Sequence, residues 1–107
     1  MQIQNILVIC IGNICRSPMA KYLIALQHPT LKVDSAGLSA MVGHQADEKA
    51  IACMDTVGID IREHRAKQIT ADLIKQSDLI LVMSNNQLKH IEQKWPFAKG
   101  KVFRLGH

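Results

Sequence analysis

Residues 6–20 read ILVICIGNICRSPMA, and they join an apolar run to a helix-like segment through a loop that contains two cysteines, a glycine, an asparagine and an arginine. The apolar run has the length and β-branched composition of a strand that is buried on both faces, as parallel strands are. Ser17 is a residue type that caps helices, and Pro18 suits a first helical turn. The stretch therefore predicts a strand, a loop and a helix in succession.

The rest of the chain continues this alternation. Strands are expected at residues 2–9, 31–36, 78–83 and 101–105, and helices at residues 17–28, 47–58, 70–74 and 84–94, with a loop at residues 38–45. Asp47, Thr70 and Ser84 are the expected helix caps, and Gly58 is the expected stop signal. This order predicts an α/β fold with three layers, in which a four-stranded parallel sheet carries helices on both faces. Ligands of such sheets bind beyond the carboxyl ends of the strands, where residues 10–17 are expected to lie.

Composition narrows the class of protein. The chain has 107 residues, 48% apolar and 21% charged, which predicts one globular domain over residues 1–107. We expect a cytoplasmic protein without a membrane partner, because no apolar stretch approaches the roughly 20 residues of a membrane span and no signal peptide is evident. The net charge of +4 comes from basic residues that are scattered and not interleaved with aromatics. This pattern argues against a nucleic-acid partner and suits a small anionic substrate.

Cys10 and Arg16 form a Cys-x5-Arg arrangement on the predicted loop. Successive backbone N–H groups and a helix N-terminus would give this loop the positive potential that binds an oxyanion. The guanidinium of Arg16 could hold two phosphate oxygens at once, and the same donors, with the Ser17 hydroxyl, would favour a thiolate at Cys10. Gly12 and Asn13 both tolerate the left-handed backbone that a tight anion loop needs.

Other interpretations of these residues remain open from the pattern alone. A Cys-x5-Arg spacing also arises by chance, and a cysteine at a strand end is often a small buried hydrophobe. Two cysteines five residues apart could bind zinc, but no histidine shows a matching ligand spacing, so neither a metal nor another cofactor is expected. Cys53 lies on the expected inward stripe of residues 47–58, with Ala50, Met54 and Val57, and is interpreted as a packing residue.

The run VICIGNICRSPMA (residues 8–20) closely resembles the signature of the low-molecular-weight protein tyrosine phosphatases, bacterial members above all. Further similarity runs through DSAGLSA (34–40), VGHQAD (42–47), GIDIREHRAKQIT (58–70), DLILVM (78–83) and GKVFRLGH (100–107). The resemblance implies that Cys10 is a nucleophile forming a phosphocysteine, that Arg16 clamps the phosphoryl group and that Ser17 donates to the thiolate. It implies loop-supporting roles for Asn13, Ser35 and His64, and substrate contacts from Ile11, Gly12, Asn13, Ile14, Cys15 and Met41.

The resemblance also implies a redox role for Cys15 and a protein substrate, neither of which the residue pattern alone indicates. Relatives oxidise the nucleophile to a disulfide with the second cysteine, here Cys15, whose other interpretation is packing at the helix start. The loop would hold phosphate or sulfate, and the substrate would be a tyrosine-phosphorylated protein. By analogy with the family, that protein would be a bacterial tyrosine kinase of polysaccharide export. Where the family often has arginine, in the stretch HRAK, this chain has Lys67.

One element of the family pattern is not found in residues 1–107. The family's general acid stands in an Asp-Pro-aromatic motif after the last strand, and none of the nine acidic residues here precedes a proline. We therefore expect a domain that is short at its C-terminus and lacks the last helix, so that a sheet face is uncovered and favours self-association. Loss of general acid catalysis typically costs about 10²- to 10⁴-fold.

Three functions follow from these observations. The first is a protein tyrosine phosphatase of reduced activity, acting on phosphotyrosine and small aryl phosphates. The second is a module that binds phosphotyrosine or phosphate without turnover. The third is an arsenate reductase, which would need a further cysteine pair downstream, whereas the stretch after DLILVM reads SNNQLKHIEQ.

Overall fold

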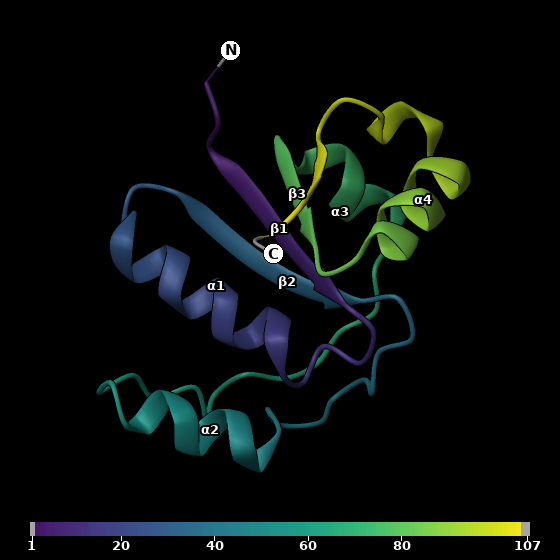
Figure 1. Cartoon of the computed structure of the whole chain (residues 1–107). Helices are drawn as coiled ribbons and strands as arrows, with labels where there is room; N and C mark the ends of the chain where they lie inside the picture. The colour runs from purple at the N-terminus through teal and green to yellow at the C-terminus, as the bar shows by residue number, and fades with distance from the viewer. Residues whose placement is uncertain (1, 106–107) are drawn as a thin grey trace.

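The computed structural model describes residues 2–105 and contains the predicted α/β sheet. Its elements are β1 (Asn5–Cys10), α1 (Arg16–Gln27), β2 (Lys32–Gly37), α2 (Glu48–Asp55), α3 (Ala71–Gln76), β3 (Leu79–Val82), α4 (Asn85–Lys94), the 3₁₀ turn η1 (Pro96–Ala98) and β4 (Val102–Arg104). The strands lie in the order β2-β1-β3-β4, and every neighbouring pair is parallel. Helices α1 and α2 lie on one side of the sheet and α3 and α4 on the other (Figure 1), which confirms the predicted fold class.

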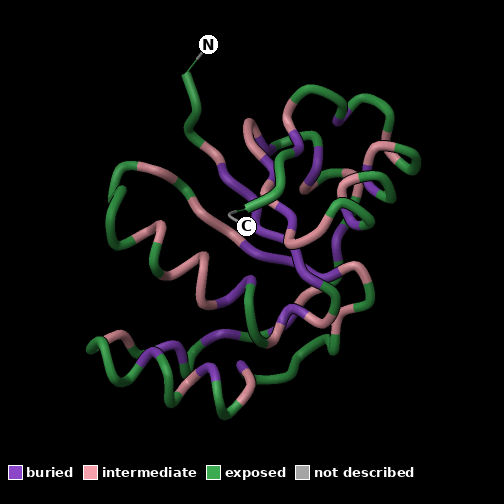
Figure 2. Tube along the Cα trace, viewed as in Figure 1, coloured by how far each residue is buried: buried purple, intermediate pink, exposed green. Residues whose placement is uncertain are grey.

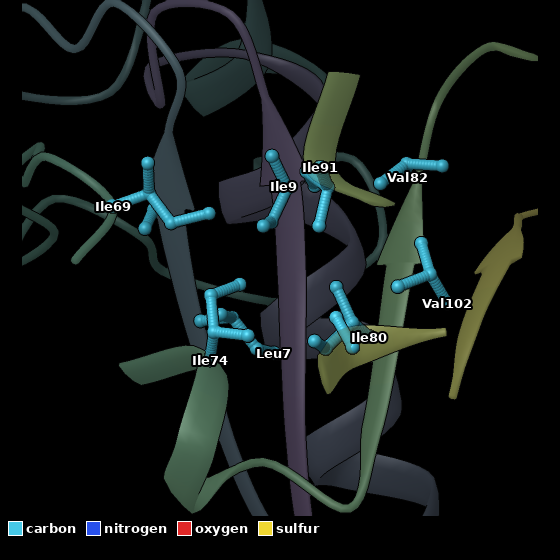
Figure 3. Packing of buried hydrophobic residues seen from close by; sticks show 10 residues of the cluster. Leu7, Ile9, Ile69, Ile74, Ile80, Val82, Ile91 and Val102 are labelled. Atoms are coloured by element: carbon cyan, nitrogen blue, oxygen red, sulfur yellow. The ribbon is translucent and has the colours of Figure 1, made fainter. Parts of the chain in front are cut away.

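The main hydrophobic core fills the space between the sheet and helices α3 and α4. Leu7 and Ile9 of β1 point into it, where they meet Ile74 of α3 and Ile91 of α4 (Figure 3). The alternate residues of β1, such as Val8, are also buried, so the strand is covered on both faces as its composition predicts. In Figure 2 the buried residues of β1 form an uninterrupted purple segment of the tube. The strand is thereby fixed in the centre of the sheet, and the loop that follows it starts from a rigid point.

Three of the predicted helix caps are present. The side chains of Asp47, Thr70 and Ser84 accept hydrogen bonds from backbone N–H groups in the first turns of α2, α3 and α4. The expectation for Ser17 was wrong, because α1 begins at Arg16 and its N-cap is Cys15, which makes no side-chain capping bond. Ser17 lies inside the first turn, where its hydroxyl contacts the side chains of Cys10 and Asn13 instead.

Helix α2 packs on α1 rather than on the sheet, and this changes which of its residues are buried. Ala50 and Met54 are buried against Met19 and Tyr22 of α1. Val57 and Cys53, which were expected to point inward, are exposed. The helix ends at Asp55, so Val57 lies in the turn beyond it, and a single helical neighbour covers only a narrow stripe of α2.

Apolar side chains of β3 and β4 reach the surface on the side of the sheet where α1 lies. Ile80, Val82 and Val102 point into the core beside α4, so Leu81 and its register partner Phe103 point the opposite way. Phe103 is 52% exposed. The expected uncovered apolar face is thus present within residues 2–105, while self-association through it stays a prediction.

Candidate active site

The loop between β1 and α1 lies at the carboxyl end of the central strand, beside the start of α4 (Figure 1). Asn13 has φ of 60°, and within residues 2–105 it is the one non-glycine residue with a positive φ. Gly12, which could also tolerate a left-handed backbone, does not have a positive φ. A Cβ on Gly12 would lie at ordinary contact distance, 3.7 Å from Ile14 and 3.8 Å from Met41. The turn of the loop therefore depends on Asn13.

The sulfur of Cys10 has hydrogen-bonding partners on two sides. Its Sγ lies 3.2 Å from the Asn13 backbone N–H, which donates to it, and 2.9 Å from the Ser17 hydroxyl oxygen. The Ser17 oxygen itself accepts a hydrogen bond from the Asn13 side-chain amide at 3.1 Å, so the hydroxyl proton is free to point at Cys10. The Asn13 N–H and the Ser17 hydroxyl can therefore both donate to the Cys10 sulfur and hold it at the floor of the loop.

Asn13 is the centre of the hydrogen-bond network that holds the loop. It is fully buried, and its amide nitrogen donates to the hydroxyls of Ser17 and Ser35. Its amide oxygen accepts the Lys67 N–H at 3.2 Å, and its carbonyl accepts a hydrogen bond from His64 Nε2 at 2.7 Å. The structure thus brings together Asn13, Ser35 and His64, the residues to which the family resemblance assigned loop support.

Replacing Asn13 with alanine should destabilise the protein and its loop together. Alanine tolerates the left-handed backbone at position 13 less well than asparagine, because its side chain cannot form a local hydrogen bond. The substitution also removes one hydrogen-bond donor from each of the Ser17 and Ser35 hydroxyls. We expect unfolding free energy to fall by about 2–3 kcal/mol. Urea denaturation measures this loss, with Asn85→Ala on the exposed start of α4 as the matched control. A loss no larger than that of Asn85→Ala would contradict the assigned role.

Lys67 contacts the loop through its backbone and contacts β2 through its side chain. Its N–H contacts Asn13, while its ammonium group forms an ion pair with Asp34 on β2. Partial burial works to raise the pKa of the Asp34 carboxyl, but the hydrogen bonds from Lys67 and from the Ser35 N–H hold it below its usual value. Neither contact could be found from sequence spacing, because Lys67 and Asn13 are 54 residues apart in the chain.

His64 is the buried titratable group of this network. It is 4% exposed, and burial lowers the pKa of its imidazole, although the hydrogen bond to the Asn13 carbonyl works the other way. A carbonyl oxygen only accepts, so the hydrogen is on Nε2. The neutral ring makes this bond without a second proton. Because burial disfavours the charged ring, the folded state binds a proton at His64 less readily than the unfolded chain does.

Acidification should destabilise the protein through His64. Between the unfolded value near 6.5 and the lower folded pKa, the unfolded state holds the extra proton, so stability rises with pH and is lost as pH falls below 6.5. Thermal unfolding at pH values from 7.5 down to 5, as an approximate range around this pKa, should show a decline that His64→Gln reduces. The exposed His90→Gln is the control. Equal slopes in wild type and His64→Gln would contradict the assignment.

A pocket of about 360 Å³ opens above the loop. Its lining residues are Cys10, Ile11, Gly12, Ile14, Cys15, Arg16, Met83 and Gln87. Arg16 is exposed, and no ion pair with it forms among residues 2–105, so its guanidinium is available to a ligand. No acidic side chain is among the lining residues. The pocket is therefore suited to a small anion that sits against the sulfur of Cys10.

Sequence reasoning missed two residues of the pocket, Met83 and Gln87. Met83 directly follows β3 and Gln87 lies in the first turn of α4, where its side-chain oxygen accepts the Met83 N–H at 2.8 Å. Nothing in their local pattern indicated a site, although the carboxyl end of a strand next to β1 was the place to look. Met41, an expected substrate contact, is not among the lining residues and instead lies against the loop, where its N–H donates to the Gly12 carbonyl at 3.1 Å.

The two cysteines of the loop differ in their surroundings. Both are free thiols in the structure. Partial burial and the nearby Asp47 carboxylate raise the pKa of Cys15, which disfavours its thiolate. Cys10, in contrast, has the two donors described above. This contrast favours Cys10 as the nucleophile and leaves the proposed disulfide between the pair as a prediction.

The model of the family described as low molecular weight phosphotyrosine protein phosphatase matches residues 5–107. The chain belongs to this family. It is 65% identical to the low molecular weight protein-tyrosine-phosphatase Ptp of Acinetobacter johnsonii, over 100% of this chain and 75% of that protein. The crystal structure of the Erwinia amylovora tyrosine phosphatase AmsI covers 99% of this chain and 70% of its own, with a TM-score of 0.95 and 43% identity.

A second solved structure is also similar to this low molecular weight phosphatase. It is the tyrosine phosphatase Wzb from Escherichia coli K30 in complex with sulphate, with a TM-score of 0.94 and 42% identity over 99% of this chain and 74% of that one. The relatives are named protein-tyrosine-phosphatases, so the present chain is a phosphatase of that class. Of the three functions expected from sequence, membership of the family supports a protein tyrosine phosphatase, and its reduced activity stays a prediction.

Proposed function

We propose that this phosphatase hydrolyses phosphotyrosine through a covalent phosphocysteine at Cys10. The observation that carries the proposal is the pair of donors on the Cys10 sulfur, the Asn13 N–H and the Ser17 hydroxyl, at the floor of a pocket that Arg16 lines. A thiolate held there faces any phosphoryl group whose oxygens bind Arg16 and the loop. Positioning of this kind supplies much of the catalysis in phosphoryl transfer.

The reaction has two displacements at phosphorus. In the first, the Cys10 thiolate forms a sulfur–phosphorus bond while the phosphorus–oxygen bond to the tyrosine breaks and the phenolate leaves. In the second, water attacks the phosphocysteine, inorganic phosphate is released and the thiolate is restored. Arg16 neutralises the charge on the equatorial oxygens in both steps. We propose that the chain does this without a metal or other cofactor, since thiolate, arginine and backbone donors supply the nucleophile and the charge stabilisation.

Departure of the tyrosine is the step for which the pocket residues provide no acidic side chain. A phenolate leaves faster when an acid protonates it, and no carboxyl group is among the pocket's lining residues. We propose that in a protein of residues 1–107 the proton comes from water, so that the rate depends strongly on the leaving group. Nitrophenolate needs little protonation, whereas tyrosine needs much.

The test compares p-nitrophenyl phosphate with phenyl phosphate and a phosphotyrosine peptide. We expect the 107-residue chain to cleave the first about 10²- to 10⁴-fold faster than the other two. Similar rates for all three would contradict the absence of an acid. Tight binding of the peptide with no cleavage of any substrate would favour the alternative of a phosphotyrosine-binding module.

We further propose that the physiological substrate is a tyrosine-phosphorylated protein, with a bacterial tyrosine kinase of polysaccharide export as the first candidate. The family resemblance supports this choice. Among residues 2–105 no helix has the length and apolar character needed to cross a membrane. A cytoplasmic location, where such a kinase would present its phosphotyrosines, stays a prediction. Release of inorganic phosphate from an autophosphorylated kinase of this type, and from no phosphoserine protein, is the expected result.

A further inference from the structure

A second hollow of about 440 Å³ lies beside the catalytic pocket, between the segment after β2 and helix α4. It shares the lining residues Ile11 and Gln87 with the catalytic pocket, so the two hollows are adjacent. Its other lining residues include Leu38 on one wall and Asn86, His90 and Lys94 of α4 on the other. We call the second hollow the α4 groove. Nothing in the proposed chemistry at Cys10 uses it.

One face of α4 forms the polar wall of the α4 groove. Asn86, His90 and Lys94 are spaced four residues apart, which places them above one another along the helix. Ile91, on another face of α4, is buried in the core and fixes the rotation of the helix. From Gln87 at the catalytic pocket to Lys94 the helix rises about 10 Å. An extended peptide covers that length in about three residues.

The α4 groove has an apolar floor and a cationic end. Ile11 is 54% exposed although it directly follows the nucleophile, and Leu38 is half-buried. The Lys94 ammonium lies 5.0 Å from the centre of the Trp95 ring and forms no ion pair among residues 2–105. His90 adds ring nitrogens, and no acidic residue lines the groove. These features match a peptide that is apolar next to the phosphotyrosine and acidic further along.

We propose that the α4 groove binds the peptide flanking the phosphotyrosine and selects an acidic side chain about three residues away, through Lys94. The inference rests on the proposed function, because it places the phosphotyrosine in the Cys10 pocket. Lys94 would then be a specificity residue that contacts the substrate far from the reacting atoms. An exposed pair of opposite charges changes affinity by only a few fold, so selection should be modest and sensitive to salt.

Binding to the Cys10→Ser chain tests the proposal without turnover. Fluorescence anisotropy compares three labelled phosphotyrosine peptides: one with aspartate three residues before the phosphotyrosine, one with aspartate three residues after it, and one with alanine at both places. We expect one aspartate peptide to bind about three- to fivefold more tightly than the alanine peptide at low ionic strength. High salt should remove the difference.

Substitutions of Lys94 assign the preference to the groove. Lys94→Gln should abolish it and Lys94→Glu should reverse it in favour of alanine. Lys89→Glu makes the same change of charge on a different face of α4, where Lys89 lines a separate surface hollow with Glu92, and it should keep the preference. Far-ultraviolet circular dichroism of all variants confirms that α4 is intact.

Two results would overturn the proposal. Equal binding of all three peptides, or a preference that Lys94→Glu and Lys89→Glu change alike, would show that the α4 groove does not read the sequence. Failure of every phosphotyrosine peptide to bind would reject the proposed function itself, and the α4 groove with it. The two failures are distinguishable because the alanine peptide reports the phosphotyrosine pocket alone.

Discussion

Replacing Cys10 with serine should reduce kcat/KM for p-nitrophenyl phosphate by about 10⁴-fold or more, with no loss of the fold. A serine hydroxyl remains protonated at neutral pH and is a much weaker nucleophile toward phosphorus than a cysteine sulfur. The side chain at position 10 is almost isosteric, and both of its partners, the Asn13 N–H and the Ser17 hydroxyl, can bond to an oxygen instead. Steady-state kinetics and circular dichroism measure the two effects.

The matched control for this substitution is Cys53→Ser. Cys53 is a free, exposed thiol on α2 and lines none of the hollows described above. Its replacement should leave kcat/KM within about twofold of wild type, as surface substitutions away from a site usually do. If Cys10→Ser retained a substantial part of the activity while Cys53→Ser lost it, the nucleophile would have been assigned to the wrong cysteine.

Replacing Arg16 with lysine should lower kcat/KM by about 10²- to 10³-fold while keeping the positive charge. Lysine is a point charge that cannot bind two phosphoryl oxygens in one plane, so the loss measures the geometry of the guanidinium rather than its charge. Arg16 forms no ion pair within residues 2–105, and the substitution therefore leaves no buried carboxylate unpaired.

Inhibition by inorganic phosphate provides a second measurement for Arg16→Lys. The inhibition constant should rise together with the loss of kcat/KM, because the same guanidinium holds the ground-state anion and the transition state. Arg62→Lys is the control, since Arg62 forms its ion pairs with Asp55 and Asp60 at the surface. Unchanged kinetics and unchanged phosphate inhibition in Arg16→Lys would show that Arg16 does not clamp the phosphoryl group.

The fold could be predicted from sequence where local signals and global packing agree. The apolar run of β1 requires burial on both faces, which α1 supplies on one face and α3, together with α4, on the other. Side-chain caps are local, so Asp47, Thr70 and Ser84 could be placed from their positions alone. The site itself was expected at the carboxyl end of β1 because parallel sheets bind ligands there.

Predictions failed where a tertiary contact decides the role of a residue. Ser17 is a residue type that often caps helices, but its hydroxyl forms hydrogen bonds with the side chains of Cys10 and Asn13 instead. Cys53 follows the helical periodicity of α2, but α1 is the one helix that packs on α2 within residues 2–105, and Cys53 is left exposed. The support that Lys67 gives to Asn13 passes through the backbone N–H, which no side-chain pattern can reveal.

Rapid acid quench with labelled p-nitrophenyl phosphate, whose leaving group needs little protonation, tests for a phosphocysteine at Cys10. Within the first turnover we expect close to one covalently bound phosphate per chain. Peptide mapping should place it on Cys10, it should disappear on a chase with unlabelled substrate, and it should be absent from Cys10→Ser. Turnover of the substrate with no label on the protein, or label on Cys15 instead, would contradict the account.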